Sequence, residues 1–317
     1  MENQKSFSQI KNFLFSNSVK KKFNLELCST WLCGRMCDYC PQTDFLQAGK
    51  KMFPKKRHKF LSIDLFKKII KNINPDNTII QWAGFTEPLD TPDFGSINKI
   101  LLEKKFDISI STTLIGKEKS KIWFIENIDK FKKITLHLPD NEKIMKGNFN
   151  NEYEEFFSKC LKKIIQKKIM NRTTLFLIGD NFHEKIKEAI FKFKKNHNIN
   201  INTAAFLNTR NSSIDVKKFG YQITNNGSIK KEDNNIISDH NFYCAYKRLN
   251  CNIVLPDGTV VLCCNDYKLE NVIGNLVSEK LETMVDNFII EQGSSFIEGS
   301  YKGCLLCEHY SPFIKDS

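Results

Sequence analysis

Three cysteines near the N-terminus are the residues of this sequence best suited to chemistry. They occur as Cys33-Gly-Arg-Met-Cys37-Asp-Tyr-Cys40, separated by three residues and then by two. Thiolates this close in sequence can each hold one iron of a [4Fe–4S] cluster, which leaves the fourth iron open to a substrate or cosubstrate. The last two cysteines also suit half of a zinc site, but zinc takes four ligands, and the nearest spare thiol, Cys28, lies on a predicted strand. We favour the cluster and keep zinc as the alternative.

A second group of six cysteines lies in the last quarter of the chain: Cys244, Cys251, Cys263, Cys264, Cys304 and Cys307. The Asp-Gly pair at 257–258 stands between two apolar runs. It predicts a hairpin turn that brings Cys251 or Cys244 near Cys263. The final two cysteines form a close pair with metal-ligand spacing. The spacing is typical of a metal site, and a four-cysteine zinc site is one interpretation of it.

The composition is that of an ordinary globular protein, with 41% hydrophobic and 26% charged residues among 317. Eleven cysteines, an odd number, argue against complete disulfide pairing. The chain has no apparent signal peptide and no apolar run near 18 residues. We therefore expect a cytoplasmic protein with metal-bound thiols and no membrane partner.

The formal charge of +12 raises the question of nucleic-acid binding. Only five residues are arginine, and the many lysines are spread over nearly every predicted helix, which is typical of solvated helix faces. The strongest local basic run, at 50–59, is either the border of an anionic substrate site or a solvated loop. We do not expect a nucleic-acid partner.

Up to about residue 208, short β-branched segments alternate with amphipathic helical ones, the pattern of a parallel α/β fold. Ser62 is the expected cap of a helix at 63–73. Residues 209–239 are rich in Asn, Lys, Asp and Ser and are expected to form a connector. The six expected strands are Phe23–Cys28, Thr78–Ala83, Asp107–Thr113, Lys133–Leu138, Thr173–Ile178 and Ile199–Phe206.

The CxxxCxxC pattern, with Tyr39 just before its last cysteine, resembles the signature of the radical S-adenosylmethionine (SAM) superfamily. The stretch Gln81-Trp-Ala-Gly-Phe-Thr-Glu-Pro-Leu89 resembles the second motif of that family, although Thr86 stands where glycine is usual. The resemblance implies a partial (β/α)6 TIM-like barrel at 23–208 that binds SAM. It also implies SAM-binding roles for Tyr39, Gly84, Glu87 and Thr112, with the three cysteines as cluster ligands.

In such barrels, ligands bind at the carboxyl ends of the strands. Both motifs meet this requirement because each directly follows a predicted strand. Polar residues Ser111–Thr113 close the third strand and His137 closes the fourth, where they are either SAM-facing or ordinary strand ends. The conceivable acid–base groups are Asp38, His137, Asp140 and Tyr267, and no spacing singles one of them out.

The segment at 240–317 resembles the Twitch domain, a truncated form of the SPASM domain that follows the barrel in many radical SAM enzymes. The resemblance implies a small α+β domain with one auxiliary [4Fe–4S] cluster, held by Cys244, Cys263, Cys304 and Cys307. Cys251 and Cys264 remain possible substitutes. The expected domain organisation is therefore a basic extension at 1–22, the barrel at 23–208, the connector at 209–239 and the Twitch-like domain at 240–317.

The resemblance implies an enzyme that cleaves SAM reductively and uses the 5′-deoxyadenosyl radical to abstract hydrogen, with electrons from a flavodoxin- or ferredoxin-type donor. A fully ligated auxiliary cluster favours net oxidation. With no distinct peptide-recognition domain at the N-terminus, we expect a small carbohydrate-like substrate. The alternatives are a peptide- or protein-modifying maturase, an RNA-modifying enzyme and, in another class, a zinc-binding module associated with nucleic acid.

Overall fold

The computed structural model describes residues 22–31, 33, 35, 37–52, 60–178, 181–196, 200–203, 242–244, 251–297 and 310–312. For residues 196, 200–203, 242–244, 293–297 and 310–312 it describes the backbone alone. The expected connector at 209–239 and residues 1–21 of the expected extension lie outside these ranges. The division into an extension, a core, a connector and an auxiliary domain stays a prediction.

Six parallel strands pair in chain order from β1 to β6. All six lie within one residue of the expected bounds, apart from the shorter last strand. In β1 to β5 buried apolar residues largely alternate with half-buried, often polar ones, so one face of the sheet packs into the main core. The strands are β1 Phe23–Leu27, β2 Thr78–Trp82, β3 Asp107–Thr112, β4 Lys133–Leu138, β5 Thr173–Leu177 and β6 Asn200–Thr203.

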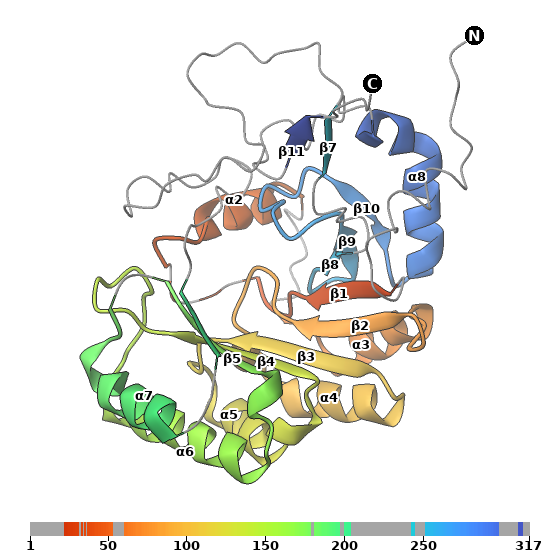
Figure 1. Ribbon diagram of the computed structural model, residues 1–317. Helices are drawn as coiled ribbons and strands as arrows, with labels where there is room; N and C mark the ends of the chain where they lie inside the picture. Colours follow the sequence, from red (N-terminus) through yellow and green to blue (C-terminus); the bar gives the residue numbers. More distant parts are fainter. Residues whose placement is uncertain are drawn as a thin grey trace, which may run out of the picture.

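Helices alternate with these strands, and Figure 1 shows α4 to α7 along one side of the curved row of strands. The Ser62 hydroxyl accepts a hydrogen bond from the Leu65 amide and caps α3, as expected, but the helix becomes 3₁₀ at Ile70. The α-helices are α2 Gln42–Met52, α3 Ile63–Ile69, α4 Phe94–Glu103, α5 Glu118–Glu126, α6 Asn151–Gln166, α7 Glu184–Asn196 and α8 Leu281–Ile297. The 3₁₀ turns are η1 Ile70–Asn72, η2 Pro88–Asp90, η3 Ile128–Lys130 and η4 Met170–Arg172.

The C-terminal part of the chain extends the barrel sheet. Strand β8 (Ile253–Val254) pairs in parallel with β1, and β9 (Thr259–Val261) and β10 (Val272–Asn275) continue the sheet outward. The described strands thus form one nine-stranded sheet in the order β10-β9-β8-β1-β2-β3-β4-β5-β6, and β7 (Phe242–Cys244) pairs with β11 (Tyr310–Pro312) separately. The predicted Asp-Gly hairpin turn is confirmed between β8 and β9, with Gly258 at a φ of +89°.

A second, smaller core lies where the C-terminal strands meet the cysteine loop. Four aromatic rings contact one another in sequence: Trp31 and Phe45 at 5.4 Å between centroids, Phe45 and Phe85 at 5.0 Å, and Phe85 and Tyr267 at 4.3 Å. They come from the loop after β1, from α2, from the loop after β2 and from the turn after β9. This packing holds the C-terminal strands against both sequence motifs.

In the part of the chain that the structure describes, no helix has the length and apolar character needed to cross a membrane.

Candidate functional site

A cavity of about 250 Å³ lies at the carboxyl ends of β1 to β4. The sequence predicted that both motifs would meet at this edge, and they do. The lining residues come from β1 and the loop after it (Glu26, Cys33, Arg35, Cys37, Tyr39, Cys40), from the start of α2 (Gln42), from the loop after β2 (Ala83–Glu87), from the ends of β3 and β4 (Ser111–Thr113, His137) and from the turn after β9 (Cys264, Tyr267). Every residue for which the resemblance implied SAM or cluster binding in the barrel therefore borders one space.

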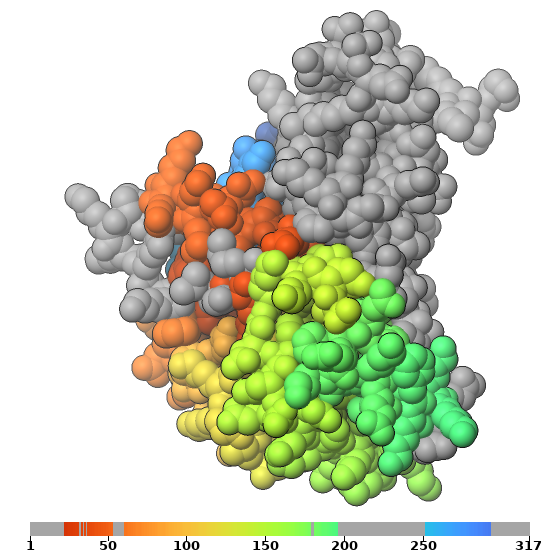
Figure 2. Space-filling view, turned by 90° about the vertical axis from the view of Figure 1, so that its left-hand side faces the viewer, coloured from red at the N-terminus to blue at the C-terminus, as the bar shows by residue number. Residues whose placement is uncertain are grey.

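The β4–α6 loop holds the middle cysteine. The Lys146 amide donates to Cys37 Sγ at 3.2 Å, and the Asp38 amide donates to the Ile144 carbonyl at 3.0 Å. An ion pair of 2.8 Å joins the Lys146 ammonium to Asp38. In Figure 2, red and orange atoms of the N-terminal part adjoin the yellow-green atoms of the middle of the chain.

Asp140 shapes that loop from within. Its carboxylate is 1% exposed and accepts hydrogen bonds from the Ile144 amide at 2.8 Å and the Met145 amide at 2.7 Å. Burial raises the pKa of Asp140, and these two hydrogen bonds oppose the shift. Asp140 was one of the conceivable acid–base groups, but its carboxylate is hydrogen-bonded to backbone amides. Its geometry is that of a residue that positions the Lys146 amide, which faces Cys37.

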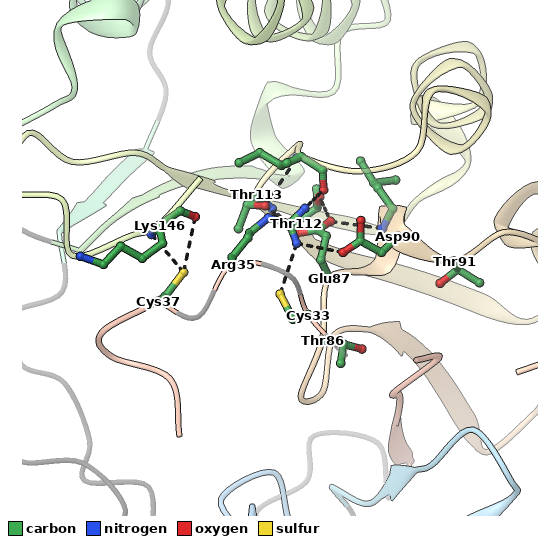
Figure 3. A network of polar contacts seen from close by, with 12 residues as sticks. Cys33, Arg35, Cys37, Thr86, Glu87, Asp90, Thr91, Thr112, Thr113 and Lys146 are labelled. Atoms are coloured by element: carbon green, nitrogen blue, oxygen red, sulfur yellow. Dashed lines mark hydrogen bonds and ion pairs between the residues drawn. The ribbon is translucent and has the colours of Figure 1, made fainter. Parts of the chain in front are cut away.

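Arg35 holds the first cysteine, Cys33, by a hydrogen bond to its sulfur (Figure 3). Its guanidinium donates to Cys33 Sγ at 3.2 Å, pairs with Asp90 at 3.0 Å and donates to the Ile115 carbonyl. Burial by itself would lower the pKa of Arg35, but the negative charges of Glu87, Cys33 and Asp90 more than offset it and raise the pKa. Arg35 therefore stays charged beside Cys33.

The third cysteine faces the other side of the cavity. Cys40 Sγ lies 4.0 Å from the Tyr267 hydroxyl and 3.9 Å from Gln42 Oε1. Gln42 is 1% exposed. The turn that carries Tyr267 is organised by Asp266, whose buried carboxylate accepts hydrogen bonds from two backbone amides.

The second motif is a tight turn bound to β1. Gly84 has a φ of +78°, and a Cβ there would lie 3.2 Å from Cys28 Cβ, so glycine suits both the conformation and the space. Thr86, which stands in place of the usual glycine, lies with its hydroxyl 3.7 Å from Cys28 Sγ. Burial raises the pKa of the Cys28 thiol to about 12, with the Thr86 hydrogen bond opposing it. Cys28 is therefore a neutral core thiol.

Glu87 is a fully bonded carboxylate. One oxygen accepts from the Leu89 amide at 3.2 Å and from the Thr112 hydroxyl. The other accepts from the Thr113 amide at 2.8 Å and the Thr113 hydroxyl at 2.7 Å. Burial raises the pKa of Glu87, and the charge of Arg35 and these hydrogen bonds oppose the rise. Glu87 thereby ties the second motif to the end of β3, as Figure 3 shows.

Glu26, Gln42 and Arg35 are site residues that the sequence reasoning missed. Glu26 is 9% exposed, lines the cavity from β1 and accepts a hydrogen bond from the Gly84 amide at 3.0 Å. A charged residue among the apolar Phe23, Leu25 and Leu27 of the strand that precedes the cysteine motif was a signal for it. Arg35 was within the motif itself. Gln42 lies at the start of an ordinary helix, where nothing marked it.

Of the four conceivable acid–base groups, two line the cavity and two do not. His137 and Tyr267 line the cavity, whereas Asp38 pairs with Lys146 on the exposed rim and Asp140 is bonded to backbone.

The predicted auxiliary ligands are only partly described. Cys304 and Cys307 lie outside the described residues, as does the side chain of Cys244 on β7. Cys263 is half-buried between the two cores, and its sulfur accepts from the Asn265 amide at 3.5 Å. Its neighbour Cys264 lines the barrel cavity. The auxiliary cluster stays a prediction.

The residues that line the cavity fit an iron–sulfur cluster. Among the described residues, no three His, Cys, Asp or Glu side chains are close enough together to hold one metal ion. Three thiols that border one cavity without converging on a point suit a cluster in which each thiolate holds a different iron. Two buried donors beside them, Arg35 Nε and Gln42 Nε2, have no hydrogen-bond partner within the protein and fit an acceptor-rich ligand.

No family model matches the chain, and no curated protein matches it. Solved structures do. The chain is similar to BtrN in complex with AdoMet (SAM) and 2-DOIA, with 13% identity and a TM-score of 0.54 over 91% of this chain and 92% of BtrN. It is also similar to anSMEcpe with bound AdoMet, with 12% identity and a TM-score of 0.50 over 92% and 86% of the two chains. The form of anSMEcpe with AdoMet and the Cp18Cys peptide gives 12% identity and 0.50 over 91% and 89%.

The chain shares the fold of these structures. The predicted partial barrel is confirmed by these matches, which run over most of both chains. The cavity lies at the edge of the sheet where the resemblance placed the cluster and SAM.

Proposed function

We propose that this protein is a radical SAM enzyme in which Cys33, Cys37 and Cys40 hold a [4Fe–4S] cluster and the adjoining cavity binds SAM. The observation that carries this proposal is the convergence of the three cysteines and the second motif on one cavity at the carboxyl ends of parallel strands. When bound, the cluster and SAM supply a 5′-deoxyadenosyl radical that removes a hydrogen atom from the substrate.

The chain's own residues hold and enclose this chemistry. The Arg35 guanidinium and the Lys146 amide donate to the sulfurs of Cys33 and Cys37, which stabilises the thiolate forms that ligate iron. Phe85 and Tyr267 are 2% and 5% exposed, and their rings contact each other at 4.3 Å between centroids with a tilt of 48°, so they form a wall that excludes water from one side of the cavity.

For the substrate we propose a small carbohydrate-like molecule that undergoes net oxidation. The similarity to BtrN, which was crystallised with AdoMet and 2-DOIA, supports a small molecule. The electron acceptor in this proposal is an auxiliary [4Fe–4S] cluster in a Twitch-like domain at 240–317, held by Cys244, Cys263, Cys304 and Cys307. A flavodoxin- or ferredoxin-type protein in the cytoplasm is the proposed electron donor.

A peptide substrate is the second candidate. It is favoured by the similarity to anSMEcpe, whose structure contains the Cp18Cys peptide. The two candidates differ in what accelerates SAM cleavage, because a true substrate traps the radical and drives turnover.

Anaerobic reconstitution tests the proposal. The purified protein should take up iron and sulfide, about eight irons per chain for two clusters and about four for one. With dithionite and SAM it should release 5′-deoxyadenosine. Polyols and amino sugars should increase that release if the substrate is carbohydrate-like, and cysteine-containing peptides should do so if it is a peptide. Stoichiometric zinc without iron, and no SAM cleavage, would refute the proposal.

Single cysteine variants locate the SAM-cleaving cluster. Changing Cys33, Cys37 or Cys40 to Ala should abolish 5′-deoxyadenosine formation and remove about four irons. Cys160→Ala is the matched control because Cys160 is buried in the core on α6, away from the cavity. It should keep the iron content and the cleavage activity of the native protein.

A further inference from the structure

The three cysteines of the motif face different hydrogen-bonding groups. The sulfurs of the first two accept from the Arg35 guanidinium and from the Lys146 amide, both at 3.2 Å. At the third, a side-chain oxygen, Gln42 Oε1, lies 3.9 Å from Cys40 Sγ. An oxygen in this position accepts the proton of a thiol, so the contact suits Cys40 in its thiol form.

Gln42 is a buried side chain whose amide nitrogen is unused. It is 1% exposed and lines the cavity from the start of α2. Among the described residues, its Nε2 group has no hydrogen-bond partner. A buried N–H donor without an acceptor costs free energy, and such groups are rare in folded proteins. The position of Gln42 therefore indicates an acceptor that is present only when the cavity is occupied.

Iron bound at Cys40 creates that acceptor. A cysteine that ligates iron is a thiolate, which has no proton to donate and accepts hydrogen bonds. Gln42 Oε1 would then face a second acceptor, whereas a half-turn of the amide about its last bond places Nε2 beside the sulfur. An N–H donor to a thiolate makes a charge-assisted hydrogen bond. The half-turn leaves the amide oxygen in the former place of Nε2, which is the smaller cost, because buried carbonyl oxygens lack partners more often than buried N–H groups do.

The packing of α2 keeps this amide beside the sulfur. The helix begins at Gln42, two residues after Cys40. Phe45, on the same helix, is fully buried and contacts the rings of Trp31 and Phe85 at 5.4 and 5.0 Å between centroids. The first turn of α2 is thus fixed by aromatic packing, and rotation of the amide requires no movement of the backbone.

We propose that Gln42 is a positioning residue for the SAM-cleaving cluster: its amide turns when the cluster binds, donates to the Cys40 thiolate and raises the reduction potential. Reduction adds one electron, and a donor to a ligand sulfur stabilises the added negative charge. This inference rests on the proposed function because it takes the three cysteines as ligands of a [4Fe–4S] cluster. It gives the third thiolate a donor from α2, as Arg35 and Lys146 serve the first two.

An EPR-monitored redox titration of the reconstituted protein tests the role of Gln42. Dithionite supplies the one electron, no bond is formed or broken, and the signal to follow is the one that Cys33→Ala lacks. Gln42→Met has a side chain of similar length without the amide. At a given potential, its ratio of reduced to oxidised cluster should be about tenfold below that of the native protein, which is a shift of about 59 mV to lower potential.

Gln47→Met is the matched control. Gln47 lies on the same helix but is exposed, so the same substitution there should leave the potential unchanged. Gln42→Leu also lacks the amide, and it replaces Gln42→Met if that variant does not fold.

A second measurement detects the hydrogen bond without any variant. Gln42 is the one glutamine among the described residues that line the cavity. Pulsed EPR of the reduced native protein, isotopically labelled at the side-chain nitrogen of glutamine, should show one labelled nitrogen coupled to the cluster. The coupling should persist in Gln47→Met and be absent from Gln42→Met.

Three results would overturn the inference: a native potential in Gln42→Met that carries its full iron, an equal shift in Gln47→Met, and no coupled glutamine nitrogen in the native protein. Failure of the proposed function is distinguishable, because the native protein itself would then take up no iron and give no cluster signal.

Discussion

Replacing Asp140 by alanine should destabilise the protein far more than removing the ion pair of the same loop. Asp140 is 1% exposed and accepts two backbone amides at 2.8 and 2.7 Å. Asp140→Ala leaves both amides buried without an acceptor, at about 1–3 kcal/mol each, so the free energy of unfolding should fall by about 2–6 kcal/mol. Lys146→Ala removes only an ion pair between side chains that are 41% and 44% exposed, which should cost less than about 1 kcal/mol.

The assay is anaerobic urea unfolding of the cluster-free protein, followed by circular dichroism. A second readout uses the reconstituted protein. The Asp140 turn aims the Lys146 amide at Cys37 Sγ, and hydrogen bonds to cluster sulfurs raise the reduction potential. Asp140→Ala should therefore lower the potential measured by EPR-monitored titration, whereas Lys146→Ala, which keeps the amide, should not. The proposed role of Asp140 would be refuted if both variants lost the same small amount of stability and had the same reduction potential.

Three further predictions concern other parts of the site. Gly116→Ala should lower the free energy of unfolding by about 1–3 kcal/mol in urea unfolding, because a Cβ there would clash with Leu89 Cβ and lie 2.5 Å from the Leu89 carbonyl carbon. Phe85→Ala should cost about 3–5 kcal/mol because it removes the ring between Phe45 and Tyr267, and a loss below about 1 kcal/mol would contradict the packing described. Burial raises the pKa of Asp266 above its usual 3.8, so the folded protein binds this proton more tightly than the unfolded chain does. The free energy of unfolding of the native protein, measured relative to that of Asp266→Asn, should therefore fall as the pH rises through the folded pKa. A difference between the two proteins that does not change between about pH 3 and 8 would contradict this prediction.

Much of the fold follows from local patterns. The six parallel strands, the Ser62 cap and the Asp-Gly hairpin turn were all predicted, because each depends on residues within one element or one turn. The meeting of the two motifs followed as well, since both come directly after strands whose carboxyl ends share one edge of a parallel sheet.

The joining of β8 to β1 was not predictable from local patterns. The cysteine spacing at 240–317 indicated a separate domain, and two short strands carry no signal of the distant strand with which they pair. Only the register of the folded chain, with Glu26 opposite Ile253, decides that the C-terminal hairpin extends the barrel sheet.

The sequence by itself determined the three cysteines and the elements that carry them, because spacing and periodicity act over a few residues. The tertiary structure alone decided what each polar group does. Glu87 is saturated by threonines about 25 residues away, and Cys37 is held by an amide 109 residues away. Hydrogen bonds of this kind depend on which strand ends are neighbours in the barrel. For that reason the second motif indicated a binding acid, and only the folded chain shows that Glu26 on β1 lines the same cavity as Glu87.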